Sequence, residues 1–449
     1  MGIQSLSSPL FTQDPRCGFH YYPDTLHYRE TDLQAWLPEL QALGVSWLVL
    51  RSELDRAIPE GFLRGIRLAG IQPIIQFQLS LDGLPVSKDV ATLLEVYARW
   101  GARYVIFFDR PNARASWNAS AWVQQDLVER FLDRFLPLAH LTLAFGMIPV
   151  FPPLEPGGSY WDTAFLRSSL QAIARRKQDL LLQSLVLSAY AWTGGRSLDW
   201  GVGGPQAWPK ARPYLTDQGN PDQRGFRIFD WYESIAGSIL NQNVPVILLQ
   251  AGLPADPATL AVQAVQSPGY SEACKSIARL LAGESVSDPL FPAKNLAPLP
   301  AQVIACNFWL LGADPSSPLA AQAWYTAGGK KHALAKWLKD WRSEHNENTR
   351  VEKSPNSEAG HSIRHYLLLP GFEWGVSDWY LEIIRPFVKK HLPTVGFSPV
   401  EAERAALVTI VGNPQNYPED LLHRLQKAGC KIEQIDGDGT KIASELAER

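Results

Sequence analysis

The sequence has few cysteines, no long apolar run and no excess of either charge. Its four cysteines lie far apart among 449 residues and form no CxxC pair, which argues against a disulfide framework or a zinc site. No apolar run approaches the roughly 18 residues of a membrane-spanning helix. The formal net charge is -3, and acidic and basic residues are mixed along the chain. We therefore expect no nucleic-acid partner and no transmembrane segment.

Metal-site and export signals are also scarce. Among the histidines, only His20 is expected at the end of a strand on the functional face, so we predict no metal site and no cofactor. Residues 1–18 lack the basic start and the apolar stretch of a secretory signal, so classical export is not expected. The sequence leaves the location open, including an association with the cell surface.

Strand-like runs alternate with helical periodicity over most of the chain. This order is typical of parallel α/β proteins, whose strands are buried on both faces. Eight such units predict a (β/α)8 barrel, the TIM-barrel fold, over residues 1–342. The expected strands are 18–22, 45–51, 71–79, 104–109, 141–150, 181–190, 245–250 and 302–309.

The rest of the chain differs from the barrel in composition. Residues 343–362 are polar with almost no apolar anchors, which predicts a linker. Residues 363–449 again alternate strand and helix, which predicts a small α/β C-terminal domain. Within the barrel, an insertion at 192–214 is too rich in Gly, Pro and Trp for regular structure.

Aromatic and polar side chains gather where the predicted barrel strands end, which is where functional groups lie in this fold. Flat aromatic rings stack on the CH faces of pyranose rings, while amide and charged groups bond the hydroxyls. We therefore expect an oligosaccharide or polysaccharide ligand. The candidate binding residues are Tyr22, Gln78, Asp109, Arg110, Asn112, Tyr190, Trp192, Gln250 and Trp309.

Two short motifs carry a resemblance to a known superfamily. The fourth strand ends in FFDRPN and the seventh in VILLQAGLP. Over residues 15–345 the sequence resembles the clan A glycoside hydrolases, which include cellulase-like and xylosidase-like barrels. Members typically end the fourth strand with Asn-Glu-Pro, where the Glu is the acid/base, and the seventh with a nucleophilic Glu. The resemblance aligns Asp109 with the Asn, Arg110 with the acid/base and Gln250 with the nucleophile. It also aligns Tyr190 with a sixth-strand Tyr and Trp309 with an eighth-strand Trp that stacks on sugar.

Both catalytic positions are therefore expected to be substituted. Retaining hydrolysis needs two carboxyl groups about 5 to 5.5 Å apart, one to attack and one to protonate the leaving oxygen. Arg110 cannot donate a proton because its pKa exceeds about 12. Gln250 can bond a sugar but cannot attack it. The first hypothesis is a carbohydrate-binding pseudoenzyme.

Two alternatives remain open. An active glycoside hydrolase would use other carboxylates, since inverting enzymes tolerate a wider separation. The catalytic candidates are Asp109, Glu53 and Glu155, with Asp199 and Asp230 also near the expected cleft. A structural or assembly protein would retain only the barrel. The insertion tryptophans Trp192, Trp200 and Trp208 favour a sugar-binding role over a purely structural one.

The C-terminal region resembles the repeats of bacterial cell-wall-binding domains. The matching positions are Val411-Gly412, Gly429-Cys430 and Gly437-Asp438-Gly439. The resemblance implies attachment to a cell wall. The alternative is a generic α/β appendage that packs on the barrel or makes a dimer contact.

Overall fold

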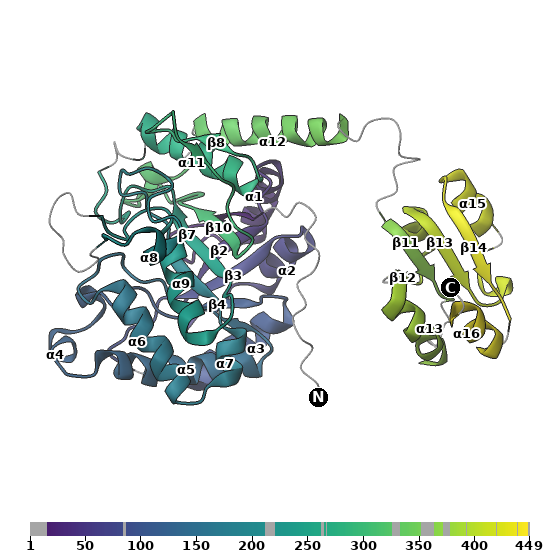
Figure 1. Ribbon diagram of the computed structural model, residues 1–449, viewed down its shortest axis with the longest axis horizontal. Coiled ribbons are helices and arrows are strands. Elements are labelled where there is room, and N and C mark those ends of the chain that lie inside the picture. Colours follow the sequence, from purple (N-terminus) through teal and green to yellow (C-terminus); the bar gives the residue numbers. More distant parts are fainter. Residues whose placement is uncertain are drawn as a thin grey trace. The chain divides into compact units, whose positions relative to one another are not determined.

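The computed structural model describes most of the chain, in two compact units, Met1–His345 and Asn346–Arg449 (Figure 1). None of the helices among the described residues is long and apolar enough to cross a bilayer. The described residues are 16–83, 87–211, 221–261, 265, 267–325, 333–351, 363–370, 378–391, 393–418, 420–437 and 439–447.

Eight parallel strands form the first unit, in the order β5-β4-β3-β2-β1-β10-β7-β6. A parallel bridge between Val150, just after β5, and Val186, just before β6, joins the two ends of this sheet. The sheet therefore closes on itself, and the predicted (β/α)8 barrel is confirmed. The strands are β1 (Cys17–His20), β2 (Trp47–Ser52), β3 (Gln72–Phe77), β4 (Tyr104–Ile106), β5 (Ile148–Pro149), β6 (Leu187–Tyr190), β7 (Val246–Ala251) and β10 (Val303–Phe308).

Helices surround these strands (Figure 1). The longer ones are α1 (Glu30–Ala42), α2 (Glu60–Leu68), α3 (Ser87–Arg99), α5 (Leu127–Ala144), α6 (Asp162–Arg175), α9 (Ile228–Leu240), α11 (Pro268–Leu281) and α12 (Ala333–Val351). Shorter elements are η1 (Arg114–Ser116), α4 (Ala119–Trp122), α7 (Asp179–Ser184), α8 (Gly204–Ala207), the hairpin strands β8 (Val286–Ser287) and β9 (Asn295–Leu296), and η2 (Ala320–Gln322).

The strand sequences explain why both faces of the sheet are buried. Successive side chains of a strand point to opposite faces, so in β2 Val49 faces the barrel interior while Leu48 and Leu50 pack toward the helices. Branched residues such as Val49, Ile74 and Ile247 fill the interior, as is usual for this fold. The barrel interior is therefore a packed core and not a channel.

Two predicted strand boundaries were wrong. Residues 141–144 belong to α5, not to the fifth strand, and residues 181–184 belong to α7, not to the sixth. Both segments are apolar runs that hydrophobicity alone cannot assign to helix or strand. Helix α12 continues to Val351, inside the predicted linker, because Glu and Arg support a helix even without an apolar face. Residues 352–362 lie outside the described part.

The second unit is a four-stranded parallel sheet in the order β12-β11-β13-β14. One face packs against α13 and α16, and the other against α14 and α15. This confirms the predicted C-terminal α/β fold, although the three-residue strand β12 was missed. The elements are β11 (Ile363–Leu368), α13 (Asp378–His391), β12 (Thr394–Gly396), α14 (Pro399–Ala402), β13 (Ala405–Val411), η4 (Pro414–Asn416), α15 (Leu421–Lys427), β14 (Lys431–Ile435) and α16 (Gly439–Ala447).

A fragment spanning 352–449 is expected to fold alone. Both faces of its sheet are covered by its own helices, and each face has its own buried apolar cluster. Circular dichroism should show mixed α/β structure and a single cooperative thermal transition. A fragment that melts without cooperativity would contradict the proposed independence of this region.

Candidate functional site

A network of charged side chains occupies the mouth of the barrel, at the carboxyl ends of the strands. The Asp109 carboxylate accepts hydrogen bonds from Arg110 Nε at 3.1 Å and from the Tyr190 hydroxyl at 2.5 Å. Arg110 Nη1 also donates to the Asp256 carboxylate, and the same nitrogen lies 3.9 Å from Glu155 Oε2. Arg110 follows β4, and Asp256 lies in the loop after β7. Their ion pair therefore connects two sides of the mouth.

The network continues through aromatic rings to Gln250. The ring of Tyr190 stacks on Trp192, with centroids 4.9 Å apart and planes 15° from parallel. Trp192 Nε1 donates to Gln250 Oε1 at 2.9 Å. An indole N–H can only donate, so this bond leaves the Gln250 NH2 group as a donor. The backbone N–H of Gln250 donates to His20 Nε2 at 3.2 Å. Arg110 and Gln250 thus belong to one connected site.

Arg110 and Gln250 both have an uncommon backbone conformation. Arg110 has φ 47° and Gln250 has φ 50°, in the left-handed region that residues other than glycine seldom adopt. The turn at Arg110 is held by its N–H, which donates to Pro153 O at 3.0 Å. Residues held in such conformations cluster at functional sites. The chain turns sharply at the ends of both β4 and β7.

Burial and charge shift the pKa values of several groups in the mouth. Burial raises the pKa of Glu155, and neighbouring Asp256 and Asp109 raise it further, against the effect of Arg110. Burial tends to lower the pKa of Arg110, but the carboxylates of Asp109 and Asp256 produce a net increase, so this side chain stays charged. Burial, with a smaller effect from Arg51, lowers the pKa of His20 to about 3. Neutral His20 can therefore accept the Gln250 N–H.

Two predicted binding residues have structural roles instead. Asn112 is 0% exposed; its amide donates to the carbonyls of Glu155 and Tyr160 and accepts from the Glu155 N–H, all within 2.9 Å. Asn112 therefore fixes the loop after β5. Trp309 is only 3% exposed, with its indole nitrogen donating to Gln322. Neither residue presents a free surface to a ligand.

Other predicted residues lie apart from the network. The half-buried Tyr22 stacks on His27 with centroids 3.9 Å apart. Gln78 is exposed and accepts a hydrogen bond from Arg51 at 2.8 Å. Glu53 is exposed, in the loop after β2. These side chains lie on the same end of the barrel as the network, but no contact joins them to Arg110 or Gln250 among the described residues.

The insertion after β6 uses its tryptophans to hold itself together. Trp200 Nε1 donates to Asp222 O at 2.7 Å, and Trp208 Nε1 donates to Val202 O at 2.9 Å. Their rings lie 4.9 Å apart. Trp200 and Trp208 are therefore engaged in contacts within the insertion. Of the three insertion tryptophans, only Trp192 contacts the network at the barrel mouth. Asp199 is paired with Lys294, and Asp230 is paired with Arg227.

Sequence reasoning missed two residues of this face. Asp256 lies six residues after Gln250 in the same loop, and that proximity was the available signal. His27 lies between β1 and α1, where its Nδ1 is 2.8 Å from Asp24 Oδ1. His20 ends β1 as expected, whereas His27 lies in the loop that follows this strand. No group of three or more His, Cys, Asp or Glu side chains able to hold a metal occurs in the part of the chain that the structure describes.

No family model matches this chain, and no curated protein matches its sequence. Similar solved structures include a family 39 glycoside hydrolase from Bacteroides cellulosilyticus, with 9% identity and a TM-score of 0.44 over 73% of this chain and 63% of that one. This chain thus spans less than two thirds of that protein. A β-galactosidase from Marinomonas ef1 has 8% identity and a TM-score of 0.39 over 93% and 75% of the two chains. A fructose-bisphosphate aldolase from Plasmodium falciparum has 12% identity and a TM-score of 0.36 over 77% and 93%. The barrel assignment rests on the closed strand order and not on these similarities.

Asn112→Ala should destabilise the barrel by about 2–3 kcal/mol, because it leaves three backbone groups of the loop after β5 without their partner. Chemical denaturation measures this loss, and hydrogen exchange should quicken at the Glu155 amide. Asn118→Ala is the matched control: it removes an exposed helix cap and should cost about 1 kcal/mol. Equal losses in the two variants would contradict the assigned role of Asn112.

The neutral state of His20 should make the protein acid-sensitive. The pKa of His20 is about 3 in the folded protein and 6.5 in the unfolded chain. Between these two pH values the unfolded chain binds a proton at His20 and the folded protein does not. The contribution of His20 to the free energy of unfolding is fully present above pH 6.5 and is lost as the pH drops toward 3. In His20→Gln the slope should be shallower over this range by up to about 1.4 kcal/mol per pH unit. Denaturation at several pH values tests this, and an unchanged slope would show that His20 is not the cause.

Proposed function

We propose that the barrel mouth binds an oligosaccharide or polysaccharide and does not carry out conventional retaining hydrolysis. The observation that carries this proposal is the network that joins Arg110, at the end of β4, to Gln250, at the end of β7, through Tyr190 and Trp192. The protein would then be a glycoside hydrolase-like pseudoenzyme.

The chemistry of Arg110 supports the absence of a catalytic pair. Its guanidinium cannot act as a proton donor at neutral pH. It also contacts three carboxylates, those of Asp109, Asp256 and Glu155. A carboxylate that is held by an arginine has its oxygens occupied by that ion pair and is less free to attack a sugar. The nearest acids are thus engaged with the residue that stands in the acid/base position.

The other half of the network offers groups suited to a sugar. Trp192 is half-buried, and its indole plane is backed by the stacked ring of Tyr190. A ring held in this way loses little conformational freedom when a pyranose stacks on it. The Gln250 NH2 group is a hydrogen-bond donor without charge. Stacking beside a neutral donor favours binding of a sugar over attack on it.

Glu155 supports a second candidate, an active glycoside hydrolase. Its raised pKa is the property required of a general acid, and the neighbouring Asp109 could act as the base of an inverting mechanism. Glu53, exposed after β2, is the remaining candidate carboxylate. A structural or assembly protein that retains only the barrel is the third reading, and it predicts no glycan binding.

Cell-wall attachment by the C-terminal unit stays a prediction. The sheet order β12-β11-β13-β14 is a doubly wound arrangement that hosts many functions. Val411-Gly412 ends β13, and Gly429-Cys430 precedes β14, as the resemblance requires. Asp438 of the third matching position lies outside the described residues. A pull-down with purified bacterial wall, using residues 352–449, would separate attachment from a generic appendage.

The main test measures binding and hydrolysis together. A panel of oligosaccharides is screened by calorimetry and by release of reducing ends. We expect binding without release, and Trp192→Ala should weaken binding by about tenfold or more, because it removes the stacking surface. Trp337→Ala is the matched control: Trp337 is also half-buried, but it lies on α12 and stacks on Trp341. It should leave binding unchanged.

Two results would overturn the proposal in different directions. Release of reducing ends that is lost in Asp109→Asn or Glu155→Gln would establish the active hydrolase. If no glycan binds, the sugar-binding proposal is wrong and the chain is a structural or assembly protein that retains only the barrel.

A further inference from the structure

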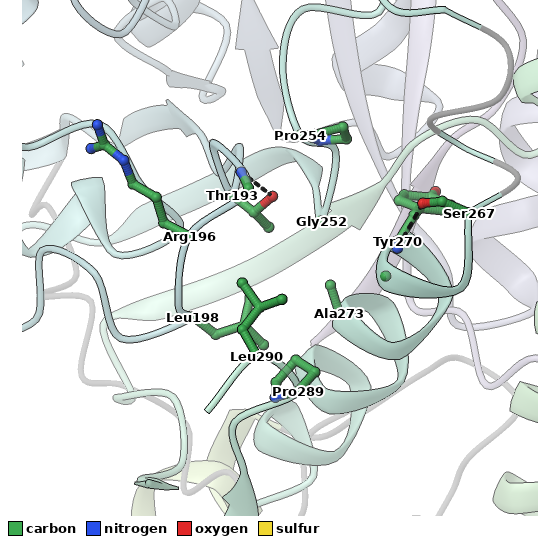
Figure 2. Close-up of a pocket in the computed structure, with 12 residues that line it drawn as sticks. Thr193, Arg196, Leu198, Gly252, Pro254, Ser267, Tyr270, Ala273, Pro289 and Leu290 are labelled. Carbon is green, nitrogen blue, oxygen red and sulfur yellow. Dashed lines mark hydrogen bonds between the residues drawn. The ribbon is translucent and has the colours of Figure 1, made fainter. Parts of the chain in front are cut away.

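A small apolar pocket lies beside the barrel mouth, at the rim (Figure 2). Its walls come from the loops after β6 and β7, the start of α11 and the loop between β8 and β9. The cavity volume is ≈ 160 Å³. In Figure 2, Leu198, Leu290 and Pro289 lie on one side of the cavity and Thr193 and Pro254 on the other.

The polar side chains around this pocket are already bonded. Thr193 Oγ1 lies 3.4 Å from both the Leu253 carbonyl, to which it donates, and the Gly195 N–H, from which it accepts. Arg196 is held by the Asp222 carboxylate. The Tyr270 hydroxyl donates to Trp309 O at 2.9 Å. Since these polar groups already have partners and most of the lining is carbon, the pocket favours an apolar occupant.

The size of the cavity limits this occupant. An aliphatic cavity of about 150 Å³ stays dry and accepts a benzene ring. The present pocket is of the same size and has a floor of small residues, Gly252 and Ala273. Leu290 at its edge is 49% exposed, so an occupant would also cover apolar surface that now faces water. A phenyl ring or a short alkyl group therefore fits.

The pocket and the barrel mouth are built by the same two loops. Thr193 directly follows Trp192, and Gly252 lies two residues after Gln250. Consecutive Cα atoms are about 3.8 Å apart, so the Gly252 and Gln250 Cα atoms are within about 7.6 Å. Backbone bonds fix the loops to each other: Thr193 N donates to Leu253 O at 2.7 Å, and Gly252 N donates to Ala191 O at 3.2 Å. The pocket and the barrel mouth are therefore separated by only one or two residues along each loop.

We infer that the rim pocket is a subsite for the apolar aglycone of a glycoside whose sugar occupies the barrel mouth. The assignment of the sugar part rests on the proposed function, whereas the preference for an apolar group rests on the pocket itself. The ligand class is a glycoside that carries an aryl group or a short alkyl group.

The test compares glycosides that differ only in the aglycone. Phenyl and methyl glycosides of glucose, galactose, xylose and arabinose are titrated by calorimetry. For the sugar that binds, the phenyl glycoside should bind about tenfold tighter than the methyl glycoside. Ala273→Leu, which fills the pocket, and Leu290→Asp, which makes its edge polar, should abolish this preference and leave the methyl glycoside affinity unchanged.

A control variant and a sugar-free probe separate this inference from the proposed function. Leu180→Ala changes another exposed leucine, on α7, before β6 and at the opposite end of the barrel, and should preserve the preference. Phenol alone should give a saturation-transfer NMR signal that Ala273→Leu removes.

The outcomes are distinguishable. If phenol binds in this way but no sugar does, the pocket takes apolar groups and the proposed function fails. If sugars bind while the aglycone preference is absent, or persists in both pocket variants, the subsite assignment is overturned and the proposed function stands.

Discussion

The half-buried positive charge of Arg110 is the constraint on which the barrel mouth depends. A guanidinium that is only 26% exposed must be paired, since an isolated buried charge is costly. Asp109 supplies one partner from the same strand end, Glu155 another from the loop after β5, and Asp256 the third from the loop after β7. Three separate segments are thus drawn together around one side chain.

The surrounding polar groups keep this arrangement in place. Asn112 fixes the loop that carries Glu155, and the Tyr190 hydroxyl donates to Asp109 Oδ1 while its ring stacks on Trp192. Trp192 in turn orients Gln250, whose backbone is bonded to neutral His20. Each group has its partner before any ligand arrives. A site preorganised in this way binds without the cost of ordering its side chains.

The barrel was predictable because its strands are short apolar runs whose spacing repeats, and the signal for each run is local. The candidate site was predictable only as a set of strand ends. Asn112 and Trp309 have suitable side chains at suitable ends, yet hydrogen bonds to distant segments bury them. Asp256 does not end a strand, and its role depends on an ion pair with Arg110, 146 positions away, so it was missed. Neither contact can be read from local sequence, although the position of Asp256 in the same loop as Gln250 was a signal of proximity.

The same network determines how well a carboxylate would fit at position 110 or at position 250. A Glu in place of Gln250 would keep the acceptor that Trp192 bonds and would add one negative charge. A Glu in place of Arg110 would instead bring a fourth carboxyl group among Asp109, Glu155 and Asp256 and remove their common cation. Like charges at such distances cannot all stay ionised. The three acids around Arg110 are therefore suited to an arginine at this position, and the loops after β5 and β7 contribute to this arrangement as much as the end of β4 does.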